Sequence, residues 1–196
     1  MSEKPILFNT AMVRAILEGR KTVTRRILKL PSYIEQSENN PDLYTLYAEG
    51  DAYPNQYMEN IIGYIRPPYK VGDVLYIRET WAKIPGASSE GGYAYKYKAS
   101  DEGEYWSRVN GFKWRPSIHM PKEAARIWLK VTNVRTERLN NMSRDDAMHE
   151  GIKPAFNRLL DFIELWESTI NKQDLNKYGW DANPWVWVIE FERIEK

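Results

Sequence analysis

The chain has 196 residues, with 28 Lys or Arg and 27 Asp or Glu, so its net charge is +1. This balance excludes a histone-like polycation, and the length suffices for one independent hydrophobic core. Hydrophobic residues make up 42% and charged residues 28%, which is typical of a globular protein. The absence of cysteine excludes disulfides, a thiolate nucleophile and Cys-ligated zinc, and favours a cytoplasmic location.

Neither a secretory leader nor a membrane span is expected. No basic and then apolar segment opens the chain, and the apolar run 185–189 is too short to cross a bilayer. Aromatic residues are abundant, with 8 Trp, 13 Tyr and 5 Phe. They suit either an aromatic-rich β-barrel core or an aromatic-lined ligand pocket, and composition leaves both open.

The first elements in chain order are a short strand at 5–8 and a helix at 11–18. Asn9 and Thr10 are helix N-cap candidates, and Gly19 stands where a helix C-terminal glycine belongs. A strand then follows at 20–28. Residues 13–30 carry six Lys or Arg and one acid, so this segment has a local charge of +5.

Residues 31–65 contain six acids and no Lys or Arg, so the neutral total hides two oppositely charged blocks. The stretch is rich in Asn, Tyr and Pro and has no sustained periodicity. It predicts a long loop or lid-like insertion. A second insertion is expected at 83–112, with a flexible connection at 86–92. We expect residues 1–196 to form a single domain around these two insertions.

Later elements follow from local patterns. Ser143 and Asp146 resemble a capping box that opens a short helix through His149. Pro154 starts a stronger helix with an apolar stripe of Phe156, Leu159, Leu160, Ile163 and Trp166. Further strands are predicted at 74–81, 93–98, 125–134 and 185–192.

Common catalytic motifs are missing. The chain has neither a GxxxxGK[ST] nor a GxGxxG phosphate loop. Its two histidines, 30 residues apart, do not form HExxH, which argues against a zinc hydrolase. The sequence therefore predicts no cofactor and no metal.

The segment Gly19 to Arg26 resembles the signature of ASCH domains, in which Gly19, Lys21, Thr24 and Arg26 occupy the fixed positions. Residues 71–75 are similar to the family's Gly-Asp turn, and 145–151 to its acidic-helix segment. Residues 114–121 and 180–188, rich in tryptophan, are similar to the longer ASCH proteins of phages and prophages.

This resemblance implies an α+β, PUA-like fold, in which helices flank a small antiparallel or mixed β-barrel. It also implies a basic cleft that binds a nucleoside, a nucleotide or RNA. Some small ASCH proteins are amidohydrolases that remove the acyl group from N4-acetylcytidine with a Lys, a Thr and a Glu. By motif position, these catalytic residues are Lys21, Thr24 and Glu150 here. This chain is about twice the size of those enzymes.

The implied chemistry is physically reasonable. A Thr hydroxyl attacks an amide carbonyl only when a base takes its proton, and a lysine serves as that base only when burial or nearby cations lower its pKa. Glu150 could protonate the leaving amine. On a regular strand, however, residues 21 and 24 point to opposite faces. A catalytic trio therefore requires a bulge or turn at 21–23.

Six further residues are candidate ligand contacts, each with an alternative structural role. Arg26 and Arg78 are candidates for phosphate, Glu79 for a base edge, Trp81 and Trp114 for stacking, and His119 for a base or ligand contact. Three functions remain open: an amidohydrolase acting on N4-acylated cytosine, a non-catalytic RNA or modified-base reader, and a ribonuclease. The sequence does not predict the oligomeric state.

Overall fold

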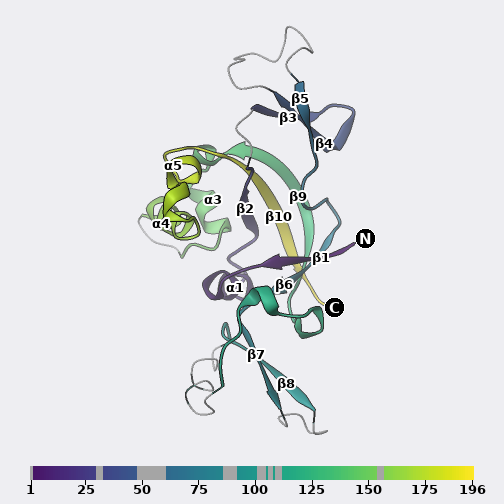
Figure 1. Ribbon diagram of the computed structural model, residues 1–196, viewed down its shortest axis with the longest axis vertical. Coiled ribbons are helices and arrows are strands. Elements are labelled where there is room, and N and C mark those ends of the chain that lie inside the picture. The colour runs from purple at the N-terminus through teal and green to yellow at the C-terminus, as the bar shows by residue number, and fades with distance from the viewer. Residues whose placement is uncertain are drawn as a thin grey trace.

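The computed structural model describes residues 2–29, 33–47, 61–85, 92–100, 105, 108, 112–153 and 157–196. The longest strands are two curved ribbons at the centre of the molecule (Figure 1). The strands are β1 (Glu3–Leu7), β2 (Val23–Ile27), β3 (Tyr33–Ser37), β4 (Asn40–Tyr47), β5 (Ile61–Ile65), β6 (Val74–Arg78), β7 (Trp81–Pro85), β8 (Tyr93–Tyr97), β9 (Trp128–Arg138) and β10 (Trp185–Ile194).

The central sheet has five strands in the order β1-β6-β9-β10-β2. β1 pairs with β6 in parallel, and the other neighbours are antiparallel. The predicted α+β class with a mixed sheet is confirmed. β1 and β2 are the two edges of this sheet, which does not close into a complete barrel.

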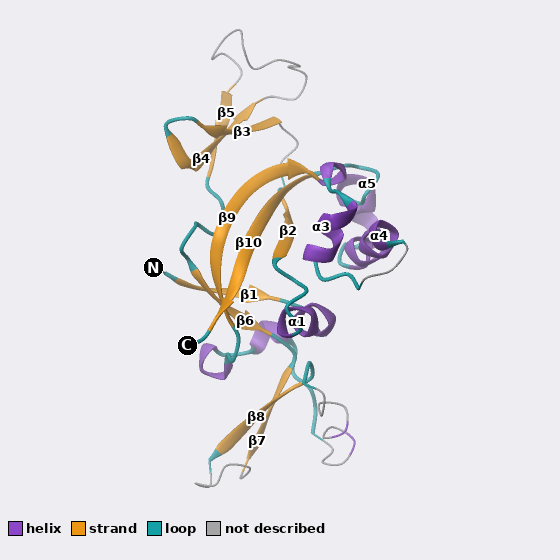
Figure 2. Ribbon diagram, turned by 180° about the vertical axis from the view of Figure 1, so that it is seen from behind, coloured by secondary structure: helices purple, strands orange, loops and turns teal. Residues whose placement is uncertain are grey.

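Within the described residues, four α-helices accompany the sheet. They are α1 (Thr10–Leu17), α3 (Arg144–His149), α4 (Arg158–Ser168) and α5 (Leu175–Tyr178). The predicted caps are present: Asn9 accepts a hydrogen bond from the Met12 amide, and Ser143 and Asp146 form the capping box of α3. α3, α4 and α5 lie together on one side of the sheet beside β2 (Figures 1 and 2).

Strand β10 is buried on both faces, which explains its nearly continuous apolar sequence. Trp187, Ile189 and Phe191 belong to a core cluster that includes residues of β1, β6 and α1. Val186 and Val188 face the opposite way, into a second cluster with residues of α3 and α4. Because strand side chains alternate, this one strand separates the two cores.

The prediction of a long loop at 31–65 is wrong. β3, β4 and β5 form a three-stranded antiparallel sheet. Tyr44 and Ile34 anchor it in the main core cluster, and the Tyr44 ring packs edge-on against Trp187 with centroids 4.7 Å apart. Register shifts in both strand pairs interrupt the alternation and obscure the strand pattern. Residues 48–60 lie outside the described part of the chain.

The single strand predicted at 74–81 is two strands in different sheets. β6 ends at Arg78, and β7 pairs with β8 as a separate two-stranded sheet that projects from one end of the molecule (Figure 1). Pro85 ends β7 rather than breaking β6. The strand expected at 125–134 begins later, at Trp128. The flexible connection expected at 86–92 falls mostly outside the described residues.

The apolar stripe of α4 differs from the predicted one. Phe162 and Trp166 are its buried residues, and Leu159 packs beside them. Leu160 is 55% exposed, because it lies off the face defined by residues 159, 162 and 166. Phe156 lies outside the described residues.

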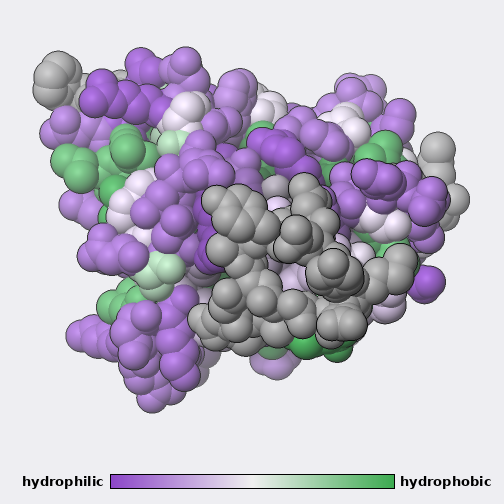
Figure 3. All heavy atoms as spheres, turned by 90° about the horizontal axis from the view of Figure 1, so that it is seen from above, coloured by the Kyte–Doolittle hydropathy of each residue, from purple (hydrophilic) through white to green (hydrophobic). Residues whose placement is uncertain are grey.

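The end of the molecule that carries β3, β4 and β5 has a mostly hydrophilic described surface with separate apolar patches (Figure 3). No helix within the described residues has the length and apolar character to cross a bilayer.

Candidate functional site

Lys21 lies between helix α1 and strand β2, where the chain changes its pairing partner. It forms an isolated antiparallel bridge with Glu150, directly after α3. The Thr22 amide donates to the His149 carbonyl over 2.9 Å, and β2 begins at Val23. Lys21 is therefore not part of the regular strand, and the strand alternation that separates residues 21 and 24 does not apply to it.

The Lys21 side chain ends on Glu150. Its Nζ lies 2.6 Å from Glu150 Oε2 and donates to the Glu150 carbonyl oxygen over 2.9 Å. The lysine side chain is fully enclosed, and that of the glutamate is 4% exposed. Residues 129 positions apart thus form a buried ion pair.

Arg25 supplies a second cation to the same carboxylate. Its NH1 donates to Glu150 Oε1 over 3.2 Å, and its Nε donates to Glu137 Oε1 over 2.9 Å. Asp146 Oδ1 lies 3.9 Å from Arg25 NH2. Glu150 therefore has a cation on each oxygen, and Arg25 remains paired with Glu137 if Glu150 changes partner.

Burial lowers the pKa of Lys21 below its usual value of 10.5. The charge and hydrogen bond of Glu150 act in the opposite direction, and Arg26 and Arg25 add to the lowering. The net direction is down because the amine has no contact with water. The environment therefore favours the neutral amine more than water does, as a catalytic base requires.

Gly151 sets how closely helix α1 approaches this pair. Its φ of +96° is in the region that favours glycine. A Cβ here would lie 2.7 Å from the Ala15 Cβ and 3.0 Å from the Lys21 Cβ. Arg20 donates to the Gly151 carbonyl oxygen and pairs with Glu18.

Thr24 is buried in β2, opposite Ile189 of β10. Strand alternation places it on the same face as Arg26 and on the opposite face from Arg25. Its hydroxyl makes no hydrogen bond to Lys21 or Glu150. Within the trio, Lys21 and Thr24 are three positions apart in sequence, but the direct contact is between Lys21 and Glu150.

Arg26 spans the gap between the two edge strands. Its NH2 donates to the Leu7 carbonyl oxygen of β1 over 2.7 Å, and its guanidinium lies 5.3 Å from the centre of the Phe8 ring. Lys21 Nζ lies 5.6 Å from the same ring centre. Burial lowers the pKa of Arg26 below its usual value.

This gap contains a cavity of about 470 Å³, which we call the seam cavity. Arg26 and Arg66 provide positive charge, and Tyr69 and Trp187 provide aromatic surface. Guanidinium groups and aromatic rings are the groups that hold phosphates and bases in nucleic-acid sites. The remaining lining residues are Pro5, Ile6, Leu7, Ile27, Ile65 and Pro68.

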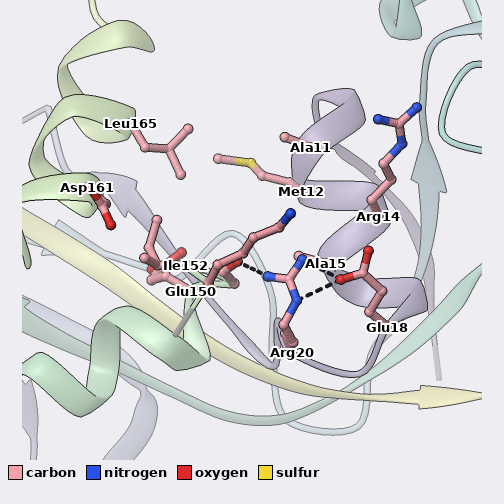
Figure 4. Close-up of a pocket in the computed structure, with 12 residues that line it drawn as sticks. Ala11, Met12, Arg14, Ala15, Glu18, Arg20, Glu150, Ile152, Asp161 and Leu165 are labelled. Carbon is pink, nitrogen blue, oxygen red and sulfur yellow. Dashed lines mark hydrogen bonds and ion pairs between the residues drawn. The ribbon is translucent and has the colours of Figure 1, made fainter. Parts of the chain in front are cut away.

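A second cavity, of about 410 Å³, lies between helices α1 and α4, and we call it the helix cavity. Glu150 and Gly151 line it, together with side chains from both helices (Figure 4). Its full lining is Ala11, Met12, Arg14, Ala15, Glu18, Arg20, Glu150, Gly151, Ile152, Lys153, Asp161 and Leu165.

Two predicted ligand contacts, Arg78 and Glu79, already have protein partners. Arg78 donates from Nε to the Met120 carbonyl over 2.8 Å and from NH2 to the Ile118 carbonyl. Glu79 is 1% exposed. Its Oε1 accepts from Arg126 Nε over 2.9 Å, and its Oε2 accepts from Arg126 NH2 over 3.0 Å. Neither residue lines the seam cavity or the helix cavity.

The predicted aromatic contacts and His119 lie away from Lys21 in the fold. Trp81 starts β7, is buried, and stacks with the Arg115 guanidinium at 5.3 Å. Trp114 packs edge-on against Phe112 at 5.0 Å. His119 is exposed in the short 3-10 helix Ser117–His119. The structure does not bring these three residues to the Lys21 pair.

Several residues around the pair had no signal in the sequence. Glu137 lies on β9, 112 residues from its partner Arg25. Phe8, Tyr69 and Trp187 are typical core or strand residues by sequence. Only their positions around Arg26 associate them with a site. Among the described residues, no group of three His, Asp or Glu side chains has metal-binding geometry.

No protein-family model matches the chain, and no curated protein matches it. The structure of this chain is similar to the crystal structure of an ASCH domain from Lactobacillus crispatus JV V101. The two share 14% sequence identity at a TM-score of 0.44, over 98% of this chain and 79% of that chain.

Proposed function

We propose that this protein is an amidohydrolase acting on N4-acylated cytidine, with the buried Lys21 and Glu150 pair as its acid-base centre. The observation that carries the proposal is the 2.6 Å contact between Lys21 Nζ and Glu150 Oε2 beside Thr24-bearing strand β2. The resemblance of Gly19, Lys21, Thr24 and Arg26 to the ASCH signature supports the same assignment.

The pair can supply a base and an acid together without gaining or losing a proton. Transfer of one proton from Lys21 to Glu150 gives a neutral amine and a protonated carboxyl group. Burial lowers the pKa of Lys21, so it favours loss of the lysine proton in this transfer. The amine is then the base for a hydroxyl nucleophile, and the carboxyl group is the acid for a leaving amine.

The reaction balances in two stages. Thr24 Oγ1 attacks the acyl carbonyl carbon as its proton passes to Lys21. The C–N bond then breaks, and N4 leaves with the proton of Glu150. In the second stage, water attacks the acyl ester on Thr24 and gives its proton to Glu150, while Lys21 returns a proton to Thr24 Oγ1. The products are cytidine and a carboxylic acid, and the pair regains its starting form.

The seam cavity suits the nucleoside part of this substrate. Arg26 lines the cavity and shares the Phe8 ring with Lys21, so the cavity wall is also part of the surroundings of the pair. Trp187 and Tyr69 offer aromatic faces for a pyrimidine.

Turnover of N4-acetylcytidine by the purified protein, followed by mass spectrometry, tests this proposal. We expect cytidine and acetate to form, and Lys21→Met, Thr24→Ala and Glu150→Gln each to lose most of the activity. Because the three act as one unit, combining the changes adds little further loss. Glu150→Gln keeps the shape of the side chain, so it disturbs the packing around Lys21 and Arg25 less than Glu150→Ala would.

A non-catalytic reader of RNA or modified bases is the second candidate, and the seam cavity favours it. Two arginines and two aromatic residues line that cavity, and Lys21 and Glu150 are not among its lining residues. If the protein binds cytidine derivatives but releases no cytidine, the reader replaces the hydrolase. A reader also predicts that Trp187→Ala weakens binding while Lys21→Met does not.

A further inference from the structure

We propose that the helix cavity holds the acyl group of the substrate, and that the protein prefers N4-acyl chains longer than acetyl. This inference rests on the proposed amidohydrolase function and names the substrate class for that same site. It concerns the cavity between α1 and α4, which the catalytic assignment itself does not use.

The helix cavity adjoins one of the proposed reacting groups. Glu150 lines it, and Glu150 Oε2 contacts Lys21 Nζ. Gly151, the next lining residue, approaches the Lys21 Cβ so closely that no side chain fits between them. Under this proposal, the seam cavity near Arg26 takes the nucleoside and the helix cavity near Glu150 takes the acyl group.

The walls of the helix cavity suit an apolar chain. Met12 of α1 and Leu165 of α4 point toward each other across the space, and Ile152 lies beside Glu150 at its base (Figure 4). Ala11 and Ala15 complete the α1 side without filling the space.

The arginines of the lining are engaged elsewhere. Arg20 pairs with Glu18 and donates to the Gly151 carbonyl. Arg14 donates to the carbonyl oxygens of Lys98 and Ala99 and points away from the cavity in Figure 4. The other charged lining residues are Lys153, Asp161 and Glu150, so the lining has three basic and three acidic side chains. The lining thus has no excess of one charge that would select an anionic acyl group.

The size of the cavity exceeds what acetyl requires. A volume of about 410 Å³ compares with roughly 30 Å³ for one water molecule in the liquid. An acetyl group would leave most of it without contacts, whereas a hexanoyl chain can reach between Met12 and Leu165. Burying a methylene stabilises a complex enough to raise kcat/KM by roughly fourfold.

The test is a series of N4-acylcytidines with acetyl, butyryl and hexanoyl groups, assayed with the wild-type protein. We expect kcat/KM to rise along the series. Leu165→Trp, which places bulk in the cavity, lowers kcat/KM for the hexanoyl substrate at least tenfold and changes it for the acetyl substrate by less than twofold. Leu160→Trp is the matched control, because Leu160 is on the same helix, exposed and outside the lining. It leaves both rates unchanged.

The outcomes separate this inference from the proposed function. If acetyl is cleaved best and Leu165→Trp affects all substrates equally, the acyl pocket is wrong while the hydrolase stands. If no acylcytidine is cleaved, both are wrong. Circular dichroism of each variant establishes that it is folded. If Leu165→Trp does not fold, Met12→Ala serves instead, and a hexanoyl rate unchanged by the loss of the Met12 contact overturns the inference.

Discussion

Two buried carboxylates, Glu79 and Glu150, are both paired with cations but in different surroundings. Arg126 donates one hydrogen bond to each carboxylate oxygen of Glu79. Its guanidinium also lies 4.1 Å from the centre of the Tyr97 ring and donates to Ser100 Oγ over 2.9 Å. Each oxygen of Glu79 thus has a partner in planar geometry, and Glu79 lines neither of the cavities described above. This pair anchors the start of the β7 and β8 hairpin.

Glu150 instead divides its oxygens between Lys21 and Arg25 and lines the helix cavity. Its lysine is enclosed and has a lowered pKa. Both glutamates are buried and paired, so burial and pairing alone do not distinguish a structural from a reactive carboxylate. We propose that the reactive one is the carboxylate whose partner can give up a proton and that lies next to a space that can hold a ligand.

The largest expected difference between the two regions is in stability. Arg126→Met leaves Glu79 buried without its partner, which costs about 3–5 kcal/mol. Lys21→Met leaves Glu150 paired with Arg25. It also removes an amine whose charged form is disfavoured by burial. We therefore expect the free energy of unfolding of Lys21→Met to equal or exceed that of the wild type. Urea unfolding measures both, and equal destabilisation by the two changes would contradict the distinction.

Gly151→Ala is the next largest test, because it combines backbone strain with a clash against Ala15 and Lys21. The positive φ alone costs roughly 1–2 kcal/mol. Gly72→Ala is the matched control, since Gly72 has φ +87° but open space where its Cβ would be. We expect Gly151→Ala to lower stability more than Gly72→Ala and, unlike it, to lower acylcytidine turnover. Equal effects on both measurements would show that Gly151 does not position Lys21.

The lowered pKa of Lys21 predicts a pH dependence. Between its folded pKa and 10.5, the unfolded chain holds the proton that the folded chain has lost, so stability rises with pH across this window. The wild type should therefore gain stability relative to Lys21→Met as pH rises toward 10.5. Tyr97, whose pKa burial raises to about 12, lowers stability above pH 10 in both proteins and cancels in the comparison. If the free energy of unfolding of the wild type, relative to that of Lys21→Met, instead fell as pH rose toward 10.5, Glu150 would outweigh burial and the pKa of Lys21 would be raised.

The smallest expected effect concerns salt. If the ligand is polymeric RNA, its affinity falls with ionic strength, and Arg26→Gln makes the slope of log affinity against log salt shallower by about one unit. Lys130→Gln, on the exposed part of β9, is the control and leaves the slope unchanged. An unchanged slope with Arg26→Gln would remove Arg26 from the phosphate contacts.

Local signals in the sequence predicted the local structure well. Asn9 caps α1, and Ser143 with Asp146 caps α3, because a cap depends on residues three positions apart. Apart from the apolar stripe of α4, the failures concern non-local pairing of strands. Nothing near Glu79 indicates that the chain leaves one sheet there for another, since its partner Arg126 is 47 residues away.

The candidate site shows the same limit. Lys21 and Glu150 were associated only through the resemblance to ASCH domains, and the spacing along a regular strand argued against placing residues 21 and 24 together. The bridge between Lys21 and Glu150 removes that objection for Lys21, because it precedes the strand. The seam cavity could not be predicted from the sequence, because its lining residues come from separate segments that meet only in the folded chain. Four of them are Leu7, Arg26, Tyr69 and Trp187.

The most direct test of the central claim is the turnover of N4-acetylcytidine and N4-hexanoylcytidine by Lys21→Met and Arg126→Met, each corrected for its folded fraction. We expect Lys21→Met to stay folded and to lose at least about 100-fold in rate, the usual minimum for a general base. Arg126→Met should retain wild-type turnover per folded molecule. Turnover by folded Lys21→Met at the wild-type rate would contradict the claim that this buried pair is the reactive centre.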